Sequence, residues 1–382
     1  MNDFSFSIPQ DICVGRGSLK KLPDFAKKLG GKHAFIISGP HLNKMGVVGA
    51  CKKNLENEGI PVDAFTETEG NPSVETVNKA AAKMKACGAD FIVALGGGSP
   101  MDVAKAVGVL VKYGGSITEY EGADKVPGKI VPLIAVPTTA GTGSEVTAFS
   151  VITDHSRDYK LTVFSYELLP AYAILDADLI ATAPASIAAA CGIDAMVHAL
   201  EAYISKAASP FSDAMAEKAL ELIGSSIRQY VADRRNKEAA ENMLVGSLFA
   251  GIAFSWARLG DVHAMSHPVS AHFDVAHGVA NAILLPIIVE YNAPEDQGKY
   301  LKIYNYISDS RMESGHFKPE MLAELLKDLN KKLGIPSGLK EVGVTEDKFD
   351  AMADDAMKSG NIAVNPRDTT KSDVMELYKK AL

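Results

Sequence analysis

The sequence predicts two domains: an α/β domain built on a parallel sheet in residues 1–184, and an all-helical domain in residues 185–382. In the first part, short β-branched runs alternate with stretches of helical periodicity, as in a parallel sheet covered by helices. After about Pro184 the β-branched runs nearly disappear, and Ala- and Leu-rich segments of helical period follow. With 382 residues, 47% of them hydrophobic, the chain can fill two cores, and we expect the chemistry to lie in a cleft between them.

The first domain contains candidate strands joined by candidate crossover helices. Helices are expected in 18–30 and 73–88, where apolar residues recur at three- and four-residue spacing. Each begins with a serine, Ser18 or Ser73, that can cap a helix N-terminus. The candidate strands are 34–38 (AFIIS), 62–66, 91–95 (FIVAL) and 132–136 (PLIAV).

Composition excludes several classes of partner. The formal net charge is −8 and the basic residues are scattered, so we expect no nucleic-acid partner. The first residues contain an acid and no apolar signal segment, and no stretch of 18 uncharged apolar residues follows, which predicts a cytoplasmic protein without a membrane partner. The cysteines lie far apart without a C-x-x-C pair, which suggests reduced thiols and neither a disulfide framework nor a thiolate zinc site; they are Cys13, Cys51, Cys87 and Cys191.

A glycine-rich segment follows the candidate strand 91–95 and leads into a helix. Glycines there let backbone N–H groups approach a phosphate without obstruction by a Cβ atom. Ser99 is expected as the N-cap, with Pro100 at the first helical position and Asp102 completing a capping box. The positive end of this helix would then face the three glycines, which are Gly96, Gly97 and Gly98.

A second such segment, 136–145 (VPTTAGTGSE), follows the next candidate strand. It offers the hydroxyl groups of Thr138, Thr139 and Thr142 beside two glycines. Together the two segments predict a site that holds both ends of a dinucleotide. The alternative is that each is only a glycine-rich loop, and the G-x-G-x-x-G pattern of standard dinucleotide sites is absent.

Clustered histidines in the second domain predict a metal site. Asp194 and His198 lie four residues apart in an otherwise apolar helix, so they share one face. The chain has nine histidines, and four of them fall within fifteen residues: His263, His267, His272 and His277. One carboxylate and three imidazoles suit iron(II) or zinc better than magnesium or calcium. Any single histidine could instead be structural, and we keep that interpretation for His272, which does not share the helical face of His267.

These motifs resemble the iron-containing, or group III, alcohol dehydrogenases, which include lactaldehyde reductases, propanediol dehydrogenases and butanol dehydrogenases. The resemblance covers essentially the whole chain. The matching segments, in the family's order and spacing, are GGGSPMDVAK, PTTAGTGSEVT, GIDAMVHALEAYIS, VHAMSHPVSAHFDVAHGVANAILLP and the NPR at 365–367.

The resemblance implies a Rossmann-like α/β domain, a helical C-terminal domain, NAD(P) as cofactor and a homodimer or larger homo-oligomer. It implies that a divalent metal, usually Fe2+ and sometimes Zn2+, is held by Asp194, His198, His263 and His277. His267 resembles the histidine that lies near the nicotinamide and the substrate.

The GGGS and TTAGTGS segments resemble the family's pyrophosphate and nicotinamide sites, and we expect further contacts from residues outside them. We expect cofactor contacts from Gly39, Asn71, Gly96, Gly97, Gly98, Ser99, Asp102, Thr138, Thr139, Thr142, Ser144 and Lys160. We expect substrate contacts from Phe149, Val151, Phe254, Arg258 and Ile362.

The implied reaction moves a hydride between a nicotinamide and a small alcohol or aldehyde. The metal would polarise the substrate oxygen as a Lewis acid. His267 is expected to carry the proton, because an imidazole titrates near neutral pH; a water chain or the cofactor ribose are the alternatives.

The sequence departs from the family at two places. Many NAD-preferring relatives have an acid after the strand that corresponds to 34–38, where this chain has Ser38, Gly39, Pro40 and His41, so NADPH is not excluded. Before His263 the chain reads FSWARLGD, and Arg258 in the substrate site would favour a short aldehyde that carries a carboxylate, sulfonate or phosphonate. The alternative is a packed Trp256 and a solvated Arg258.

Other functions remain as competing hypotheses. Glycerol dehydrogenases and dehydroquinate synthases, the latter lyases, share the expected architecture. Asp194 in place of a glutamate, and the third histidine His277, argue against the synthase. A non-enzymatic metal-binding module would not need two phosphate-binding loops.

Overall fold

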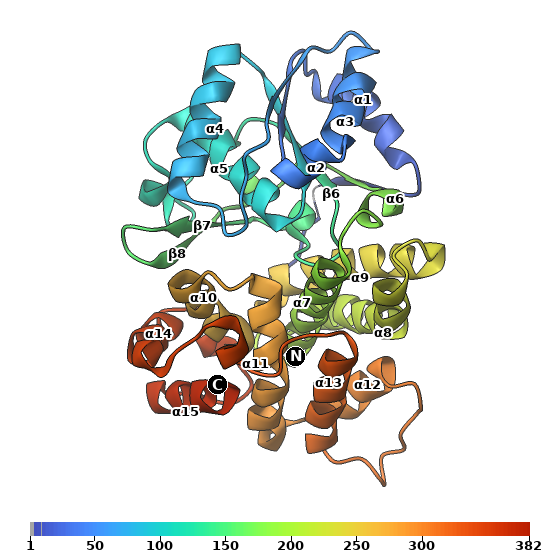
Figure 1. Ribbon diagram of the computed structural model, residues 1–382, viewed down its shortest axis with the longest axis vertical. Helices are drawn as coiled ribbons and strands as arrows, with labels where there is room; N and C mark the ends of the chain where they lie inside the picture. Colours follow the sequence, from blue (N-terminus) through green and yellow to red (C-terminus); the bar gives the residue numbers. More distant parts are fainter. Residues whose placement is uncertain (1–3, 9) are drawn as a thin grey trace. The chain divides into compact units, whose positions relative to one another are not determined.

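The computed structural model describes residues 4–8 and 10–382, which form two compact units (Figure 1). The α/β unit contains Ser7–Thr139 and Ser144–Thr182. The helical unit contains Ala183–Leu382, residues 4–6 and the short stretch Ala140–Gly143. The predicted fold class, an α/β domain with a parallel sheet and an all-helical domain, is confirmed.

A six-stranded parallel sheet forms the centre of the α/β unit, in the order β1-β9-β6-β4-β2-β3. The four strands predicted from the sequence are confirmed as β2, β3, β4 and β6, whereas β1 and β9, which pair with each other at one side of the sheet, were not predicted. The strands are β1 (Asp11–Val14), β2 (Ala34–Ile37), β3 (Val62–Phe65), β4 (Phe91–Gly96), β6 (Leu133–Pro137) and β9 (Tyr172–Leu175).

Helices cover both faces of this sheet (Figure 1). Alternate residues of β2 point to opposite faces of the sheet. Phe35 and Ile37 belong to the core beneath α4 and α5. Ala34 and Ile36 belong to the core beneath α1 and α3. Burial on both faces explains why the central strands are continuous apolar runs. The helices of this unit are α1 (Leu22–Leu29), α2 (Pro40–Lys44), α3 (Val47–Glu56), α4 (Val74–Cys87), α5 (Gly98–Tyr113) and α6 (Ala177–Ile180).

A smaller sheet, which the sequence did not lead us to expect, completes the α/β unit. It has the order β5-β8-β7, where β5 is Gly122–Ala123, β7 is Phe149–Asp154 and β8 is Tyr159–Phe164. β7 and β8 form an antiparallel hairpin, and β5 pairs with β8 in parallel.

One of the two serine caps expected for the crossover helices is confirmed. Ser73 is the N-cap of α4, and its hydroxyl accepts a hydrogen bond from the backbone N–H of Thr76. The cap expected at Ser18 is wrong, because a 3-10 helix at Ser18–Lys21 precedes α1 and the Ser18 hydroxyl donates to the carbonyl of Leu175.

The capping box expected at the start of α5 is also wrong. The helix begins at Gly98 with Gly97 as its N-cap, and no side chain caps it. The Asp102 carboxylate instead accepts a hydrogen bond from the Ser144 hydroxyl at 3.1 Å. The glycines let the helix start earlier than the serine, and the first N–H groups of α5 are left without a side-chain cap.

The second unit is helical throughout the fully described range 185–382. α7 is its central helix and packs against α8, α9 and α11 (Figure 1). The helices are α7 (Ala185–Ile204), α8 (Pro210–Ala232), α9 (Lys237–Ala257), α10 (Asp261–Phe273), α11 (His277–Asn292), α12 (Lys299–Ile307), α13 (Glu320–Lys332), α14 (Phe349–Met357) and α15 (Lys371–Ala381).

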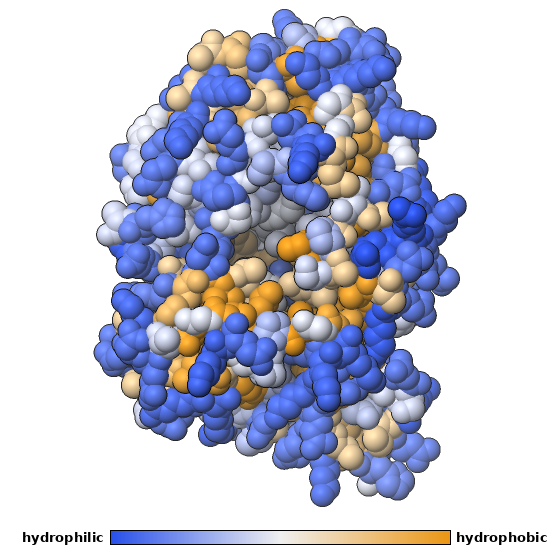
Figure 2. Space-filling model, in the orientation of Figure 1, coloured by the Kyte–Doolittle hydropathy of each residue, from blue (hydrophilic) through white to orange (hydrophobic). Residues whose placement is uncertain are grey.

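By length and composition alone, α7 is apolar enough to cross a membrane, as is the pair α9 and α10, which is bent by 103°. However, 83% of the apolar window of α7 is buried within the structure, which is typical of the core helix of a soluble protein. The face of the molecule in Figure 2 is mostly hydrophilic at its periphery, with hydrophobic residues gathered over the part of the helical unit that includes α10.

Candidate metal and cofactor sites

Three helices bring the four candidate metal ligands together. Asp194 and His198 lie one turn apart on α7, His263 lies near the start of α10, and His277 is the first residue of α11. The first three side chains are buried and His277 is partly buried, so the group is mostly shielded from water.

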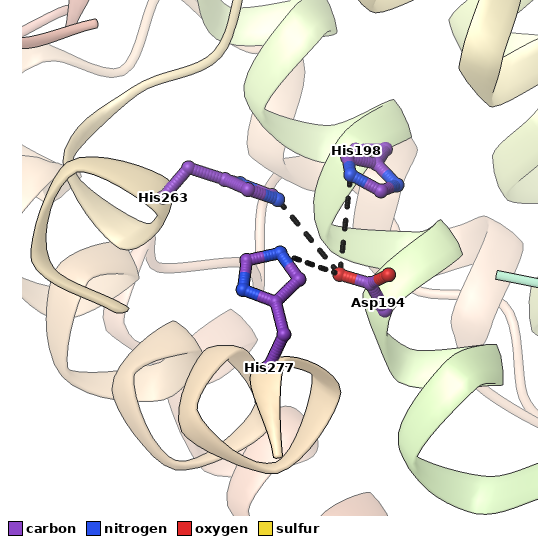
Figure 3. A group of neighbouring side chains, drawn as sticks. All are labelled: Asp194, His198, His263 and His277. Atoms are coloured by element: carbon purple, nitrogen blue, oxygen red, sulfur yellow. Dashed lines mark ion pairs between the residues drawn. The ribbon is translucent and has the colours of Figure 1, made fainter. Parts of the chain in front are cut away.

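The geometry of this group fits a single metal ion. The Nε2 atoms of His198, His263 and His277 lie 3.9, 3.8 and 3.7 Å from one oxygen, Asp194 Oδ1 (Figure 3). One ligand atom from each of the four residues lies within 4.8 Å of the others. Tetrahedral coordination with bonds of about 2.0–2.2 Å places ligand atoms about 3.3–3.6 Å apart, so a small inward movement would complete the site. Three nitrogens and one oxygen suit Fe2+ or Zn2+.

Hydrogen bonds to the other ring nitrogens orient two of the imidazoles. Glu201 Oε2 lies 2.6 Å from His263 Nδ1, and Glu201 Oε1 accepts from the backbone N–H of Val262 at 2.7 Å. His198 Nδ1 lies 3.3 Å from the carbonyl oxygen of Gly141. Both contacts favour a proton on Nδ1 and leave Nε2 with a lone pair for the metal.

Burial also favours the neutral form of His263. Desolvation, together with the neighbouring His198, holds the pKa of His263 well below its usual value. Burial raises the pKa of Glu201 to about 7, although its backbone hydrogen bonds oppose the shift. A neutral imidazole is the form that binds metals.

Asn281 belongs to this group but was not predicted from the sequence. Its side-chain Nδ2 donates to Asp194 Oδ1 at 2.6 Å and lies 3.1 Å from the Nε2 atoms of both His263 and His277. It is fully buried on α11, one turn after His277. That four-residue spacing from a candidate ligand was the available signal.

A network that includes the late NPR motif fixes the start of α10. Asn365 Oδ1 accepts from the backbone N–H of Asp261 at 3.3 Å, and Thr369 Oγ1 donates to Asp261 Oδ2 at 2.6 Å. Asp261 is the first residue of α10 and lies two residues before His263. The distant motif therefore holds the helix that carries one of the candidate ligands.

The other two histidines of the cluster lie outside the group of four ligands. His267 lies beside it, with its ring centroid 5.2 Å from that of His277 and 6.1 Å from that of His263, and it is partly exposed. His272 points elsewhere and lies 3.0 Å from a carboxylate oxygen of Asp355.

The expected substrate residues fall in both units. In the helical unit, the Phe254 ring stacks on His198 at a centroid distance of 4.5 Å. Arg258 follows one turn later, at the end of α9, with an exposed side chain and a φ of 62°. The Arg258 guanidinium lies so close to Gly360 that a Cβ atom at Gly360 would overlap it. Arg258 therefore contacts the segment that also contains Ile362, two residues after Gly360. Phe149 and Val151 lie on β7 of the α/β unit.

Most of the expected cofactor residues gather where strands of the parallel sheet end. β3 pairs with one side of β2 and β4 pairs with the other. The order in which strands are added to the sheet therefore reverses between β2 and β4. Ligands of such sheets bind at the carboxyl ends of the strands beside this switch point. Gly39 follows β2, the segment 96–99 spans the end of β4 and the start of α5, and Thr138 and Thr139 follow β6.

Direct contacts link these residues in pairs. A Cβ atom on Gly97 would lie 3.0 Å from Thr139 Oγ1, so the backbone of Gly97 lies close to the Thr139 side chain. The Lys160 Nζ donates to Asn71 Oδ1 at 2.7 Å, and Asn71 has a φ of 49°. Thr142, in contrast, belongs to the short stretch that packs in the helical unit.

A cluster of buried charged side chains beneath these loops was not predicted from the sequence. Lys105 on α5 is fully buried, and its Nζ donates to the carbonyl oxygens of Ser144 and Phe149, both at 2.8 Å. Burial lowers the pKa of Lys105 to about 8 and raises the pKa values of Asp102 and Glu145 to about 6 and about 7. Lysine in a helix usually lies on its exposed face, so nothing in the local pattern pointed to this cluster.

Comparison with known proteins identifies the family of both parts of the chain. Residues 9–177 match the model of the iron-containing alcohol dehydrogenases, and residues 188–382 match that of the C-terminal part of the Fe-containing alcohol dehydrogenase family.

Three curated relatives align with nearly the whole chain. A 1,3-propanediol dehydrogenase of Citrobacter freundii is 37% identical, with 99% of this chain and 98% of the relative covered. An NAD-dependent methanol dehydrogenase of Bacillus methanolicus is 34% identical, with 99% and 100% covered. An NADPH-dependent butanol dehydrogenase of Clostridium saccharobutylicum is 36% identical, with 98% and 97% covered.

Solved structures agree with this relationship. A 1,3-propanediol oxidoreductase superposes with a TM-score of 0.94 at 36% identity, and both chains are fully covered. A sulfoacetaldehyde reductase of Bifidobacterium kashiwanohense, solved with NAD+, superposes with a TM-score of 0.88 at 29% identity, with 100% and 99% covered.

The expectations of an enzyme, a nicotinamide cofactor and a divalent metal are thereby confirmed. The chain belongs to the iron-containing alcohol dehydrogenase family and is an NAD(P)-linked oxidoreductase of alcohols and aldehydes.

Proposed function

We propose that this enzyme interconverts a short aldehyde and its alcohol, with Asp194, His198, His263 and His277 as the ligands of a divalent metal, Fe2+ before Zn2+. The observation that carries the proposal is the convergence of three imidazole Nε2 atoms on one buried carboxylate oxygen. When bound there, the metal would act as a Lewis acid toward the substrate oxygen.

The residues of the chain supply the remaining functions. Glu201 and Gly141 hold the rings of His263 and His198 in the orientation that metal binding needs. His267 is the proposed proton carrier, because its partly exposed ring lies beside the ligand group without belonging to it.

Metal content of two variants tests this division of roles. We expect His263→Ala to lose metal and activity together, whereas His267→Ala should lose activity and keep the metal. Elemental analysis of both purified proteins gives the result. Equal loss of metal from both variants would contradict the proposed roles.

For the cofactor, we propose that the switch-point loops bind NADH or NADPH. After β2 the chain continues with Ser38 and Gly39, the N-cap of α2, and neither offers a carboxylate to repel a 2′-phosphate. His41 on α2 could favour that phosphate, and the curated relatives include both NAD-dependent and NADPH-dependent enzymes. Turnover measured with NADH and with NADPH across an aldehyde panel decides the preference.

A second candidate is reduction of a short anionic aldehyde. It is favoured by Arg258, an exposed residue one turn beyond the Phe254 ring that stacks on His198. One structural relative is a sulfoacetaldehyde reductase.

If Arg258 binds the anion, Arg258→Gln should raise KM for an anionic aldehyde and not for a neutral one of equal length. Arg235→Gln, at another exposed arginine, is the matched control. A wild-type preference for the neutral aldehyde would count against this candidate.

We also propose that residues 1–184 bind the dinucleotide, that residues 185–382 bind the metal and the substrate, and that the enzyme is a cytoplasmic homodimer or larger oligomer. The placement of the phosphate-binding loops and of the ligand group supports the first two statements. The family resemblance supports the oligomer, which sedimentation measurements can test.

A further inference from the structure

A second cluster of metal-ligating side chains lies in the α/β unit. His33 directly precedes β2, Asp63 is the second residue of β3, and Cys87 is the last residue of α4. One potential ligand atom from each lies within 4.8 Å of the others. The three residues are far apart in the sequence and meet only because β2 and β3 pair in parallel while α4 returns to the same end of the sheet.

The cluster is held in place by its backbone. The N–H of His33 donates to Asp90 Oδ1 at 2.9 Å, and the N–H of Asp90 donates to the carbonyl of His33 at 3.0 Å. Asp63 is paired with Phe35 in the sheet. The three side chains therefore extend from fixed points, and little ordering is needed when a ligand binds.

The side chains themselves are close to metal-binding positions and remain accessible. His33 Nε2 lies 2.9 Å from Asp63 Oδ2, and the Cys87 thiol donates to the carbonyl of Met84 at 3.3 Å. The side chains of His33 and Asp63 are 24% and 48% exposed, so an ion can reach them from water. The ion pair between His33 and Asp63 involves only these two side chains, whereas the Cys87 thiol adds a third donor atom to the group.

We propose that His33, Asp63 and Cys87 bind a second transition-metal ion, with Zn2+ as the preferred species. Nitrogen, oxygen and sulfur together form a donor set that zinc accepts in tetrahedral geometry, with the fourth position left to water. Magnesium and calcium prefer oxygen donors alone. On binding, the thiolate of Cys87 forms the bond to the metal and its proton leaves to solvent.

This site is separate from the cofactor loops. His33 and Asp63 lie at the amino ends of their strands, whereas Gly39 and the 96–99 segment lie at the carboxyl ends. A strand of four residues spans about 13 Å, so the two ends of the sheet do not share ligands. The two groups of metal-ligating side chains also share no residue, so the second metal would bind with the active-site metal in place.

Cobalt substitution tests the proposal with a signal that the active-site group of Asp194, His198, His263 and His277 cannot give. A Co2+ ion bound by a thiolate has a sulfur-to-metal charge-transfer band in the near ultraviolet, and the active-site group offers only nitrogen and oxygen. We expect Co2+ added to the holoenzyme to produce that band, and Zn2+ to abolish it by displacement. Elemental analysis after Zn2+ loading should give about two metals per chain instead of one.

Variants assign the band to its ligands. Cys87→Ser should abolish it, and Asp63→Asn should weaken Co2+ binding by about tenfold or more while keeping the band. Cys13→Ser, at another partly exposed cysteine of the α/β unit, is the matched control and should leave the band unchanged. The proposal fails if the wild-type holoenzyme shows no charge-transfer band, or if the band persists in Cys87→Ser. Neither result depends on the proposed catalytic roles.

Discussion

At the scale of single residues, two fully buried charged groups do not touch the proposed metal yet hold parts of the proposed sites in place. Lys105 connects α5 to the segment around Ser144, and Glu201 connects α7 to the start of α10. A buried charge is stable only when partners compensate its lost hydration. Removing the charge of Lys105 should therefore affect the stability of the α/β unit, and removing that of Glu201 should affect metal binding.

Replacement of Lys105 should destabilise the α/β unit. Lys105→Met leaves the buried carboxyl groups of Asp102 and Glu145 without their cation, which should cost about 3–5 kcal/mol of unfolding free energy near neutral pH. Lys112→Met, at an exposed position of the same helix, is the control and should change it by less than about 0.5 kcal/mol. Chemical denaturation measures both.

The cost of Lys105→Met should also depend on pH. The folded-state pKa values of Asp102 and Glu145 are raised to about 6 and about 7, above their ordinary values of 3.8 and 4.5. Loss of the cation raises them further, so the folded variant keeps protons that the unfolded chain releases, and its stability falls as pH rises through this range. The loss should thus be smaller at about pH 5.5 than at about pH 8. A loss independent of pH would show that the two carboxyl groups are not involved.

Replacement of Glu201 should weaken metal binding rather than the fold. Glu201→Gln keeps the shape of the side chain but removes the charge that accepts the His263 Nδ1 proton, which should lower metal affinity by about 10–100-fold. Glu221→Gln, on the exposed face of α8, should bind metal like the wild type. Competition with a calibrated chelator measures both affinities. Unchanged affinity in Glu201→Gln would exclude a positioning role.

At the scale of elements, the ligand group depends on how closely α11 begins beside α7. A Cβ atom on Gly278 would lie 2.5 Å from the backbone carbonyl oxygen of Ala190, which is closer than any real contact. Gly278 therefore permits the close approach that brings the adjacent His277 to Asp194. Only a glycine allows the two helices to approach this closely.

Gly278→Ala should therefore impair both stability and metal binding. Separation of α11 from α7 should cost about 1–3 kcal/mol and move His277 away from the other ligands. Gly49→Ala on α3 is the control, because a Cβ there meets no atom within 4 Å and should stabilise its helix by up to about 1 kcal/mol. Thermal unfolding and metal content are the two measurements. Normal metal content in Gly278→Ala would show that the approach is not needed.

At the scale of the whole molecule, metal binding should stabilise the helical unit selectively, because the four proposed ligands all lie in it. A ligand present at a hundred times its Kd adds about 2.7 kcal/mol to the stability of the state that binds it. In enzyme that holds only this metal, without added Zn2+, chelation should accordingly lower the Tm and increase hydrogen exchange in α7, α10 and α11 more than in β2 and β4. His263→Ala should show no such response to a chelator. A uniform increase over both units would contradict the proposed location of the metal.

The fold could be predicted where local sequence reflects burial. β2, β4 and β6 are covered on both faces, so their apolar runs were recognisable, and the helical unit showed its period directly. β1 was missed because it is a short edge strand, of which only Ile12 and Cys13 are partly buried. The start of α5 was misplaced because backbone geometry at Gly97, not the capping preference of Ser99, sets it.

The fold class and the presence of a metal site could be predicted from the amino-acid sequence, because they depend on spacing within single helices and on clustering within short segments. The set of four candidate ligands followed from the resemblance of the motifs to a known family. The contacts between distant elements came from the tertiary structure alone: Glu201 against His263, Asn281 among the proposed metal ligands, Lys105 beneath the proposed cofactor loops, and Cys87 beside His33. Each of these contacts joins side chains from different elements or different faces, and the distance between such groups is fixed by packing and strand pairing. Local periodicity carries no information about those distances.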